Sequence, residues 1–332
     1  MVKFFLSDDE KLEQIQGFSP SCWVDMVNPS DEECAEVAEV TGIPEDMIKA
    51  ALDEEERARS EFDEGCSMFV LDCPIIEEGE VGDSYTTLPL AVIYNKNCLV
   101  TVCLKGNTVL KNFITGRDKI DTRKPVNFIL KFMLGNAKRF LYCLKQIDRK
   151  KNRIQSEMER TMRNAEIMQL LDLENSLVYF STSLNSNERV HEKLSRVEAV
   201  KTREEYQDLY DDVSIETKQA IETCHIYKDI LSVTMDAYGS IISNNANNTM
   251  RTLTIITILL AVPTMIAGFW GMNMPVPFQS GVEFVSTVWF WLVIAGTLLL
   301  TAAIALVIVR FFTERRPRQK RQRQSRKSRR SD

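Results

Sequence analysis

A run of small and polar side chains recurs along one helical stretch in the C-terminal third of the chain. Its members are separated by alternating steps of three and four residues, a 3.5-residue repeat typical of parallel helices around a common axis. From the C-terminal end they are Gly268, Thr264, Ala261, Thr257, Thr254, Met250, Asn247, Ser243, Ser240 and Asp236. Most residues between them from 253 to 266 are bulky and aliphatic. Several copies of this helix around an axis would enclose a polar, water-filled pore.

The alternative interpretation of this stripe is close helix packing, because small residues let two membrane helices approach. It accounts well for Ala261 and Gly268. It accounts less well for Asn247, Ser243 and Asp236, which lie beyond the apolar stretch, where close packing is not needed. The polar part of the stripe therefore favours a wet pore.

Two uncharged segments are long enough to cross a membrane. Residues 253–282 and 284–309 contain no charged residue, and each exceeds the ~20 residues that span ~30 Å of hydrocarbon at ~1.5 Å per residue. The sequence therefore predicts transmembrane helices at 252–273 and 286–309. Pro263 is expected to bend or loosen the first of them, although neighbouring helices make such prolines tolerable in membranes.

Charge places the two ends of the chain on the same side of the membrane. Residues 314–332 carry ten Lys or Arg and two acids, a net charge of +8, whereas residues 1–313 carry 31 against 45, a net charge of −14. The connector at 274–285 contains no Lys or Arg. Because positive residues stay inside, both termini are predicted to be cytoplasmic and the protein to lie in the plasma membrane. The basic tail is expected to contact lipid rather than nucleic acid.

The N-terminal part has the pattern of a soluble α/β domain. Runs at 67–72, 87–94 and 98–104 predict strands, the last two joined as a hairpin across 95–97. Ser30 followed by Glu33 predicts a capping box at a helix start. Residues after Pro125 have a helical texture, and a helix from 213 to Asn273 would have 61 residues and a length of ~90 Å.

The predicted fold is an α+β cytosolic domain followed by a long stalk helix and two transmembrane helices. Its expected parts are a cytosolic α/β domain at 1–122, a cytosolic helical segment at 123–212, a stalk helix at 213–251, transmembrane helices at 252–273 and 286–309 with an extracytoplasmic loop at 274–285 between them, and a basic cytosolic tail at 310–332.

Nothing in the sequence has the pattern of an enzyme. There is no Gly-rich phosphate loop, no CxxC pair, and no catalytic or metal-binding pattern around His191 or His225. The eight cysteines are predicted to be reduced and structural, with Cys98 and Cys103 on opposite faces of a strand. No cofactor is expected.

The tripeptide GMN, Gly271 to Asn273, stands at the outer end of the first predicted membrane helix. In that position it resembles the signature of the CorA family of magnesium channels and transporters. The stretch "PTMIAGFWGMN", the run "LDEEERAR" followed by two strands, and the basic C-terminus extend the resemblance over essentially the whole chain. Two departures stand out: Trp270 precedes GMN where the family usually has Tyr or Phe, and no acid precedes Glu283 in the outer loop, which weakens attraction of cations there.

The resemblance implies a homopentamer in the form of a funnel, with the long helix lining the pore and Mg²⁺ as the transported ion, Co²⁺ and Ni²⁺ being further candidates. Gly271, Met272 and Asn273 would then form the selectivity filter. A ring of Asn273 oxygens can accept hydrogen bonds from the water around Mg²⁺, which sheds that water reluctantly, while adding no charge. Gly271 would let the backbone approach, and Met272 is expected to pack against neighbours.

The resemblance also implies regulation by intracellular Mg²⁺ bound between neighbouring cytosolic domains. Counting back from GMN places Asp212, beside Asp211, near the family's sensing position on the long helix. The alternative is that this acid pair is simply a solvated face of the helix. Loss of these ions would loosen a symmetric closed state. Met250 and Leu253, near the inner membrane surface, are candidates for a hydrophobic gate, with ordinary interhelical packing as the alternative.

Two rival hypotheses remain. A Zn²⁺ transporter of the same architecture is one, although relatives with that preference often depart from strict GMN. A membrane-anchored sensor whose cytosolic domain does the work is the other, and it would be indifferent to changes at Asn273.

Overall fold

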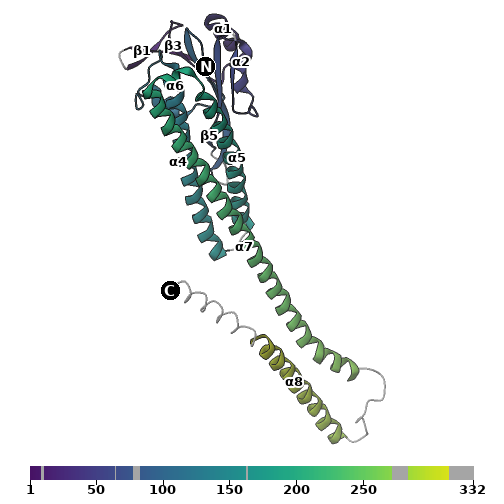
Figure 1. Cartoon of the computed structure of the whole chain (residues 1–332). Helices are drawn as coiled ribbons and strands as arrows, with labels where there is room; N and C mark the ends of the chain where they lie inside the picture. Colours follow the sequence, from purple (N-terminus) through teal and green to yellow (C-terminus); the bar gives the residue numbers. More distant parts are fainter. Residues whose placement is uncertain (9–10, 64, 78–82, 162–163, 271–282, 314–332) are drawn as a thin grey trace, which may run out of the picture. The chain divides into compact units, whose positions relative to one another are not determined.

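The computed structural model describes residues 1–8, 11–63, 65–77, 83–161, 164–270 and 283–313. These residues form two compact units, Met1–Asp236 and Ala237–Asp332, each of which is described by itself. The first unit holds a sheet and most of the helices, and the second holds the C-terminal part of one long helix and a further helix (Figure 1).

The described part of the first unit contains a seven-stranded sheet in the order β2-β1-β3-β7-β6-β5-β4. The strands are β1 (Val2–Asp8), β2 (Lys11–Ile15), β3 (Cys22–Val27), β4 (Arg59–Asp63), β5 (Cys66–Glu77), β6 (Ser84–Tyr94) and β7 (Cys98–Cys103). Neighbouring strands are antiparallel except β3 and β7, which run parallel. This pair joins the N-terminal strands to the β5–β6–β7 meander at the centre of the sheet.

The three strands predicted from the sequence are present, and β6 and β7 form the predicted hairpin. The structure contains four further strands, β1 to β4, that the sequence pattern does not predict. β2 and β4 are edge strands whose residues are exposed or only half-buried, so they lack the run of buried residues that marks a strand. All six residues of β7 are buried, because both faces of the sheet are covered.

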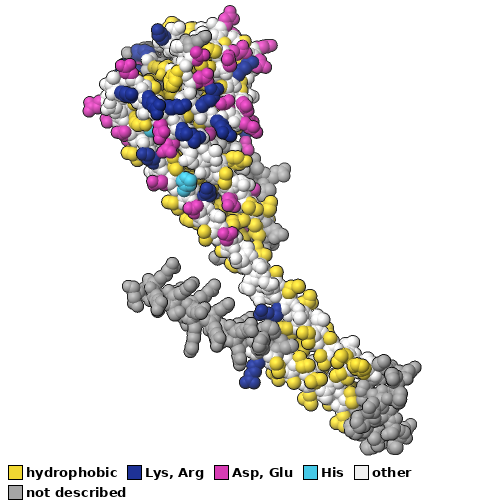
Figure 2. Space-filling model, turned by 45° about the vertical axis from the view of Figure 1, so that its right-hand side comes forward, with side chains coloured by type: hydrophobic (Ala, Val, Ile, Leu, Met, Phe, Trp, Pro, Cys, Tyr) yellow, Lys and Arg dark blue, Asp and Glu magenta, His cyan; other side chains and the backbone are white. Residues whose placement is uncertain are grey.

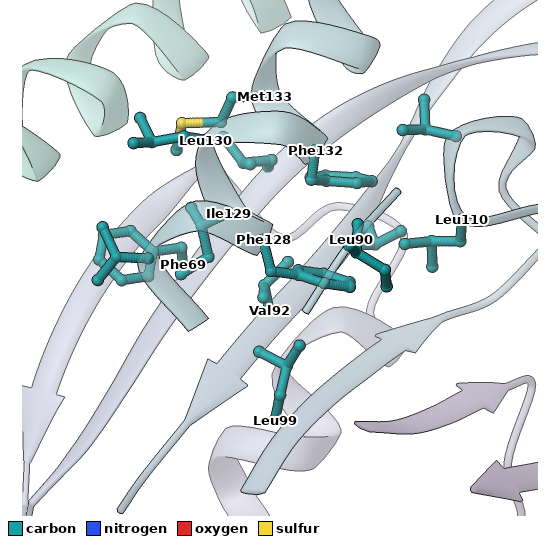
Figure 3. Packing of buried hydrophobic residues seen from close by; sticks show 14 of the residues in the cluster. Phe69, Leu90, Val92, Leu99, Leu110, Phe128, Ile129, Leu130, Phe132 and Met133 are labelled. Carbon is teal, nitrogen blue, oxygen red and sulfur yellow. The ribbon is translucent and has the colours of Figure 1, made fainter. Parts of the chain in front are cut away.

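Alternate residues of the strands enter two separate cores, one on each face of the sheet. Trp23, Phe69 and Leu99 belong to the core that α4 (Pro125–Thr161) covers. Figure 3 shows Phe69 and Leu99 together with Phe128 of α4 in this core. Val24 and Val100 belong to the other core, beneath α1 (Asp31–Thr41) and α2 (Glu45–Lys49). The division follows from the two-residue period of a strand.

The predicted alternation of Cys98 and Cys103 is confirmed, since Cys98 lies in the core under α1 and α2 and Cys103 in the core under α4. All eight cysteines lie among the described residues, where they are buried and form no disulfide. Burial raises the pKa of the Cys98 and Cys103 thiols to about 12, which keeps them protonated and unreactive.

The predicted capping box at the start of α1 is confirmed. The Ser30 hydroxyl accepts from the Glu33 N–H at 3.2 Å, and the Ser30 N–H donates to Glu33 Oε2 at 3.0 Å. Gly42 ends the helix with φ 69°, a left-handed conformation that costs glycine little. A short 3-10 turn, Ala50–Leu52, follows α2, and α3 (Thr108–Ile114) begins at an Asn107 cap.

Long helices make up most of the described residues from Pro125 onward, as the sequence predicts. They are α4 (Pro125–Thr161), α5 (Asn164–Leu194), the short α6 (Glu198–Thr202), α7 (Glu204–Trp270) and α8 (Glu283–Thr313). Proline suits the first position of α4, where its missing N–H has no helical acceptor. The helix expected from residue 213 begins earlier, at Glu204, and continues through Pro263.

Among the described residues, α7 is the one helix long and apolar enough to cross a membrane. The described apolar part of α8, Trp291–Val307, is shorter. The second predicted span at 286–309 falls within α8 but stays a prediction. Figure 2 shows charged side chains gathered on the Met1–Asp236 unit and mainly hydrophobic ones on the described C-terminal helices.

Candidate functional site

The small and polar stripe of α7 is exposed throughout the second unit. Thr254, Thr257, Ala261, Thr264 and Gly268 are all exposed in the single chain. The half-buried residues of the same stretch lie on another face: Ile255, Leu259, Val262, Pro263 and Ile266. At ~100° per residue, the centres of the two sets lie on roughly opposite sides of the helix. The chain therefore covers the aliphatic side of α7 and leaves the stripe uncovered.

α8 carries a matching half-buried face in the same unit. Its members recur every three or four residues and are Val293, Ile294, Thr297, Thr301, Ile304 and Ala305. One half-buried face on each of two helices within a compact unit is what pairwise helix packing produces.

Bulky aliphatic residues border the stripe on both sides. Ile258 (42% exposed) and Met265 (59%) lie along one border, and Leu253 (60%) and Leu260 (65%) along the other. Met250, at 67% exposed, lies on the stripe itself. Of the two predicted gate residues, Met250 is thus on the stripe and Leu253 at its border.

The threonine hydroxyls of the stripe all donate to backbone. Thr254 Oγ1 donates to the Met250 carbonyl at 2.8 Å, Thr257 to Leu253 at 2.9 Å and Thr264 to Leu260 at 2.8 Å. Each hydroxyl has one proton, and these bonds occupy it. The three threonine hydroxyls therefore present oxygen lone pairs outward, and these accept hydrogen bonds and attract cations or their bound water.

The remaining predicted pore residues are placed as follows. Asn247 and Asp236 are exposed on α7, which carries the stripe from one unit into the other. Gly271, Met272 and Asn273 lie outside the described residues.

Asp211 and Asp212, the predicted sensor pair, are both exposed on α7. Adjacent residues on a helix point about 100° apart, so the two carboxylates do not face each other as joint ligands of one ion. Among the described residues, no group of three or more His, Cys, Asp or Glu side chains could hold a metal ion.

The first unit contains a buried polar cluster around His191 that the sequence pattern does not predict. His191 is 4% exposed, and its ring stacks on Tyr210 with 4.0 Å between centroids. Burial lowers its pKa, opposed by a hydrogen bond to the backbone of Tyr210. No local pattern marks His191, because its neighbours come from three different helices.

Comparison with known proteins gives a consistent result over nearly the whole chain. The family described as "CorA-like Mg2+ transporter protein" matches residues 19–316. The cobalt/magnesium transport protein CorA of Methanocaldococcus jannaschii is 29% identical over 285 residues, covering 82% of this chain and 85% of that protein. The protein of the same name from Thermotoga maritima is 23% identical over 276 residues, covering 82% and 78%.

The fold is also that of a solved full-length structure. The CorA magnesium transporter from Methanocaldococcus jannaschii superimposes with a TM-score of 0.75 at 24% identity, covering 96% of this chain and 98% of that one. This likeness includes the mixed α/β domain, the long stalk helix and the C-terminal helix.

Proposed function

This chain belongs to the CorA-like Mg²⁺ transporter protein family, and on that premise we propose that it is a channel through which hydrated Mg²⁺ enters the cell. Its curated relatives are named cobalt/magnesium transport proteins, so it is a membrane transporter of Mg²⁺ and Co²⁺ and not an enzyme.

The main support for the proposal is the chemistry of the exposed face of the α7 stripe. The hydroxyl protons of Thr254, Thr257 and Thr264 are held by backbone carbonyls, so these three side chains offer acceptors only. Water bound to Mg²⁺ is a strong hydrogen-bond donor, because the ion withdraws electrons from it. A seam of uncharged acceptors therefore matches a hydrated cation along its path without binding it too tightly to leave.

The borders of the stripe support assembly around an axis. Aliphatic residues on both sides can contact the equivalent residues of neighbouring copies, while the seam between them faces inward. α8 would then lie on the outside, against the opposite face of α7. We propose five copies because the family resemblance implies that number.

We propose that a ring of Asn273 oxygens and the backbone near Gly271 form the selectivity filter at the outer end of the stripe. Amide oxygens add no net charge, so the ion keeps its water and passes. Two charges that cross ~100 mV inward release roughly 4.6 kcal/mol, at about 2.3 kcal/mol per charge. The membrane potential is then sufficient to drive uptake.

We place a hydrophobic gate at Met250, with Leu253 beside it, because both are large, apolar and exposed at the cytoplasmic end of the apolar part of α7. When the copies approach, such a ring expels water and closes the path to ions. Mg²⁺ bound at Asp211 or Asp212 with carboxylates of a neighbouring copy would hold this closed arrangement by reducing repulsion between acidic subunits.

Ion flux into proteoliposomes at controlled voltage tests the proposal. Mg²⁺ uptake should increase as the inside is made more negative, and Asn273→Ala should abolish it while the protein still assembles. Thr301→Ala on the half-buried face of α8 serves as the control and should keep its flux. Uptake that is unchanged in Asn273→Ala would refute the channel proposal, and a preference for Zn²⁺ over Mg²⁺ would refute the ion assignment.

A further inference from the structure

A small cavity lies inside the first unit where β5, α4, α5 and α7 meet. Its volume is about 20 Å³, and its polar lining consists of Asn136 on α4, Asn187 and His191 on α5, and Thr217 on α7. The other lining residues are apolar. A cavity needs about 10–15 Å³ to hold one water molecule, so this one has room for a single water.

Two buried polar atoms at this cavity have no partner within the described protein. They are Asn136 Oδ1 and His191 Nε2, on side chains that are 3% and 4% exposed. The orientation of the Asn136 amide is determined, because its Nδ2 donates to the Asp72 carbonyl at 2.8 Å. A flipped amide would bring two acceptors together there.

Asn187 also lines the cavity but bonds to neither atom, since both lack a partner among the described residues. Its Nδ2 donates to the Asp72 carbonyl at 2.8 Å, and its Oδ1 accepts from the Asp72 N–H at 2.9 Å. Asn187 thereby satisfies the backbone N–H and carbonyl of Asp72, which lies on β5 beyond the residues paired with β4.

His191 is neutral in this site, because burial lowers its pKa, so its imidazole has one N–H. Nε2 has no partner among the described residues, whether it carries that proton or accepts one. Stacking on Tyr210, with 12° between the rings, keeps the imidazole in this orientation.

The two atoms do not bond to each other, and a small molecule that both donates and accepts hydrogen bonds can satisfy both of them. We propose that one water molecule is bound there, donating to Asn136 Oδ1, hydrogen-bonded to His191 Nε2 and lying beside the Thr217 hydroxyl. A metal ion fits the site less well, since no carboxylate lines it to compensate a buried charge. The water links α4 to α5 at the point where α7 contributes to the cavity wall.

This inference concerns the cytosolic unit and does not depend on the transport proposal. A structure of the full-length protein at a resolution that shows ordered water is the direct test. One water should lie at ~2.7–3.2 Å from both Asn136 Oδ1 and His191 Nε2. An empty cavity, a direct contact between the two side chains, or density with metal-ligand distances near ~2.1 Å would overturn the proposal.

A double-mutant cycle provides a second test. Asn136→Leu and His191→Phe should each lower the melting temperature of the full-length protein, and the double variant should lose little more than the worse single variant, because either change releases the same water. The matched control pairs Asn136→Leu with His225→Phe, an exposed histidine on α7, and should be additive. Additive losses for Asn136 and His191, or single variants at least as stable as the parent, would contradict the shared water. If a variant fails to fold, the presence or absence of the ordered water in the structure of the parent protein tests the proposal.

Discussion

Gly135 in α4 should be required by the close approach of α3. A Cβ added at this position would lie 2.6 Å from Cγ1 and 3.3 Å from Cγ2 of Val109, a residue that is only 4% exposed. Ordinary carbon contacts are ~3.5–4.0 Å, so the two helices would have to move apart by ~1 Å or Val109 would have to leave its preferred rotamer.

The magnitude follows from two opposing effects of Gly135→Ala. Overpacking costs about 1–3 kcal/mol, and a 2.6 Å contact with a stiff, buried side chain belongs at the upper end. Alanine in a helix interior is favoured over glycine by ~1 kcal/mol. We therefore expect a net loss of about 2 kcal/mol in the free energy of unfolding.

The assay is thermal unfolding of the full-length protein in detergent, with Val109→Ala as the compensating background. That change removes both methyl carbons that the new Cβ would meet, so Gly135→Ala should stabilise the Val109→Ala protein by up to ~1 kcal/mol. A destabilisation by Gly135→Ala that is equal in both backgrounds, or none in the parent, would refute the proposed contact between α3 and α4.

Three further outcomes are expected. Thr254→Val should slow Mg²⁺ flux roughly fivefold, which corresponds to ~1 kcal/mol for a lost acceptor, whereas Thr297→Val on the half-buried face of α8 should not. The free energy of unfolding should fall as the pH drops below about 6.5, because burial lowers the pKa of His191 and the unfolded chain therefore binds the proton more strongly. Unfolding measured as a function of pH should show a weaker fall in His191→Phe. Asp212→Ala should leave flux insensitive to Mg²⁺ on the cytoplasmic side, and flux that Mg²⁺ still suppresses to the same extent would remove the sensor proposal.

Several features could be predicted because their causes are local. The capping box depends on Ser30 and Glu33 alone, and the opposite orientations of Cys98 and Cys103 depend only on the period of a strand. The membrane-length apolar part of α7 follows from composition. The stripe was recognised because its threonines recur at helical spacing.

Other features depend on the meeting of distant segments and have no local signal. The edge strands β2 and β4 are exposed enough to lack the alternation that identifies a strand. His191 has the sequence surroundings of a surface residue, yet Tyr210, Thr217 and Asn136 enclose it from other helices.

The sequence by itself determined the fold family, the apolar membrane stretch and the period of the candidate pore face, because these depend on residue type and spacing along one chain. Only the tertiary structure decided the strand order with its parallel β3–β7 pair, which face of α7 the chain itself covers, and the buried cavity between Asn136 and His191. Each of these depends on contacts between residues far apart in sequence, whose packing no local pattern specifies.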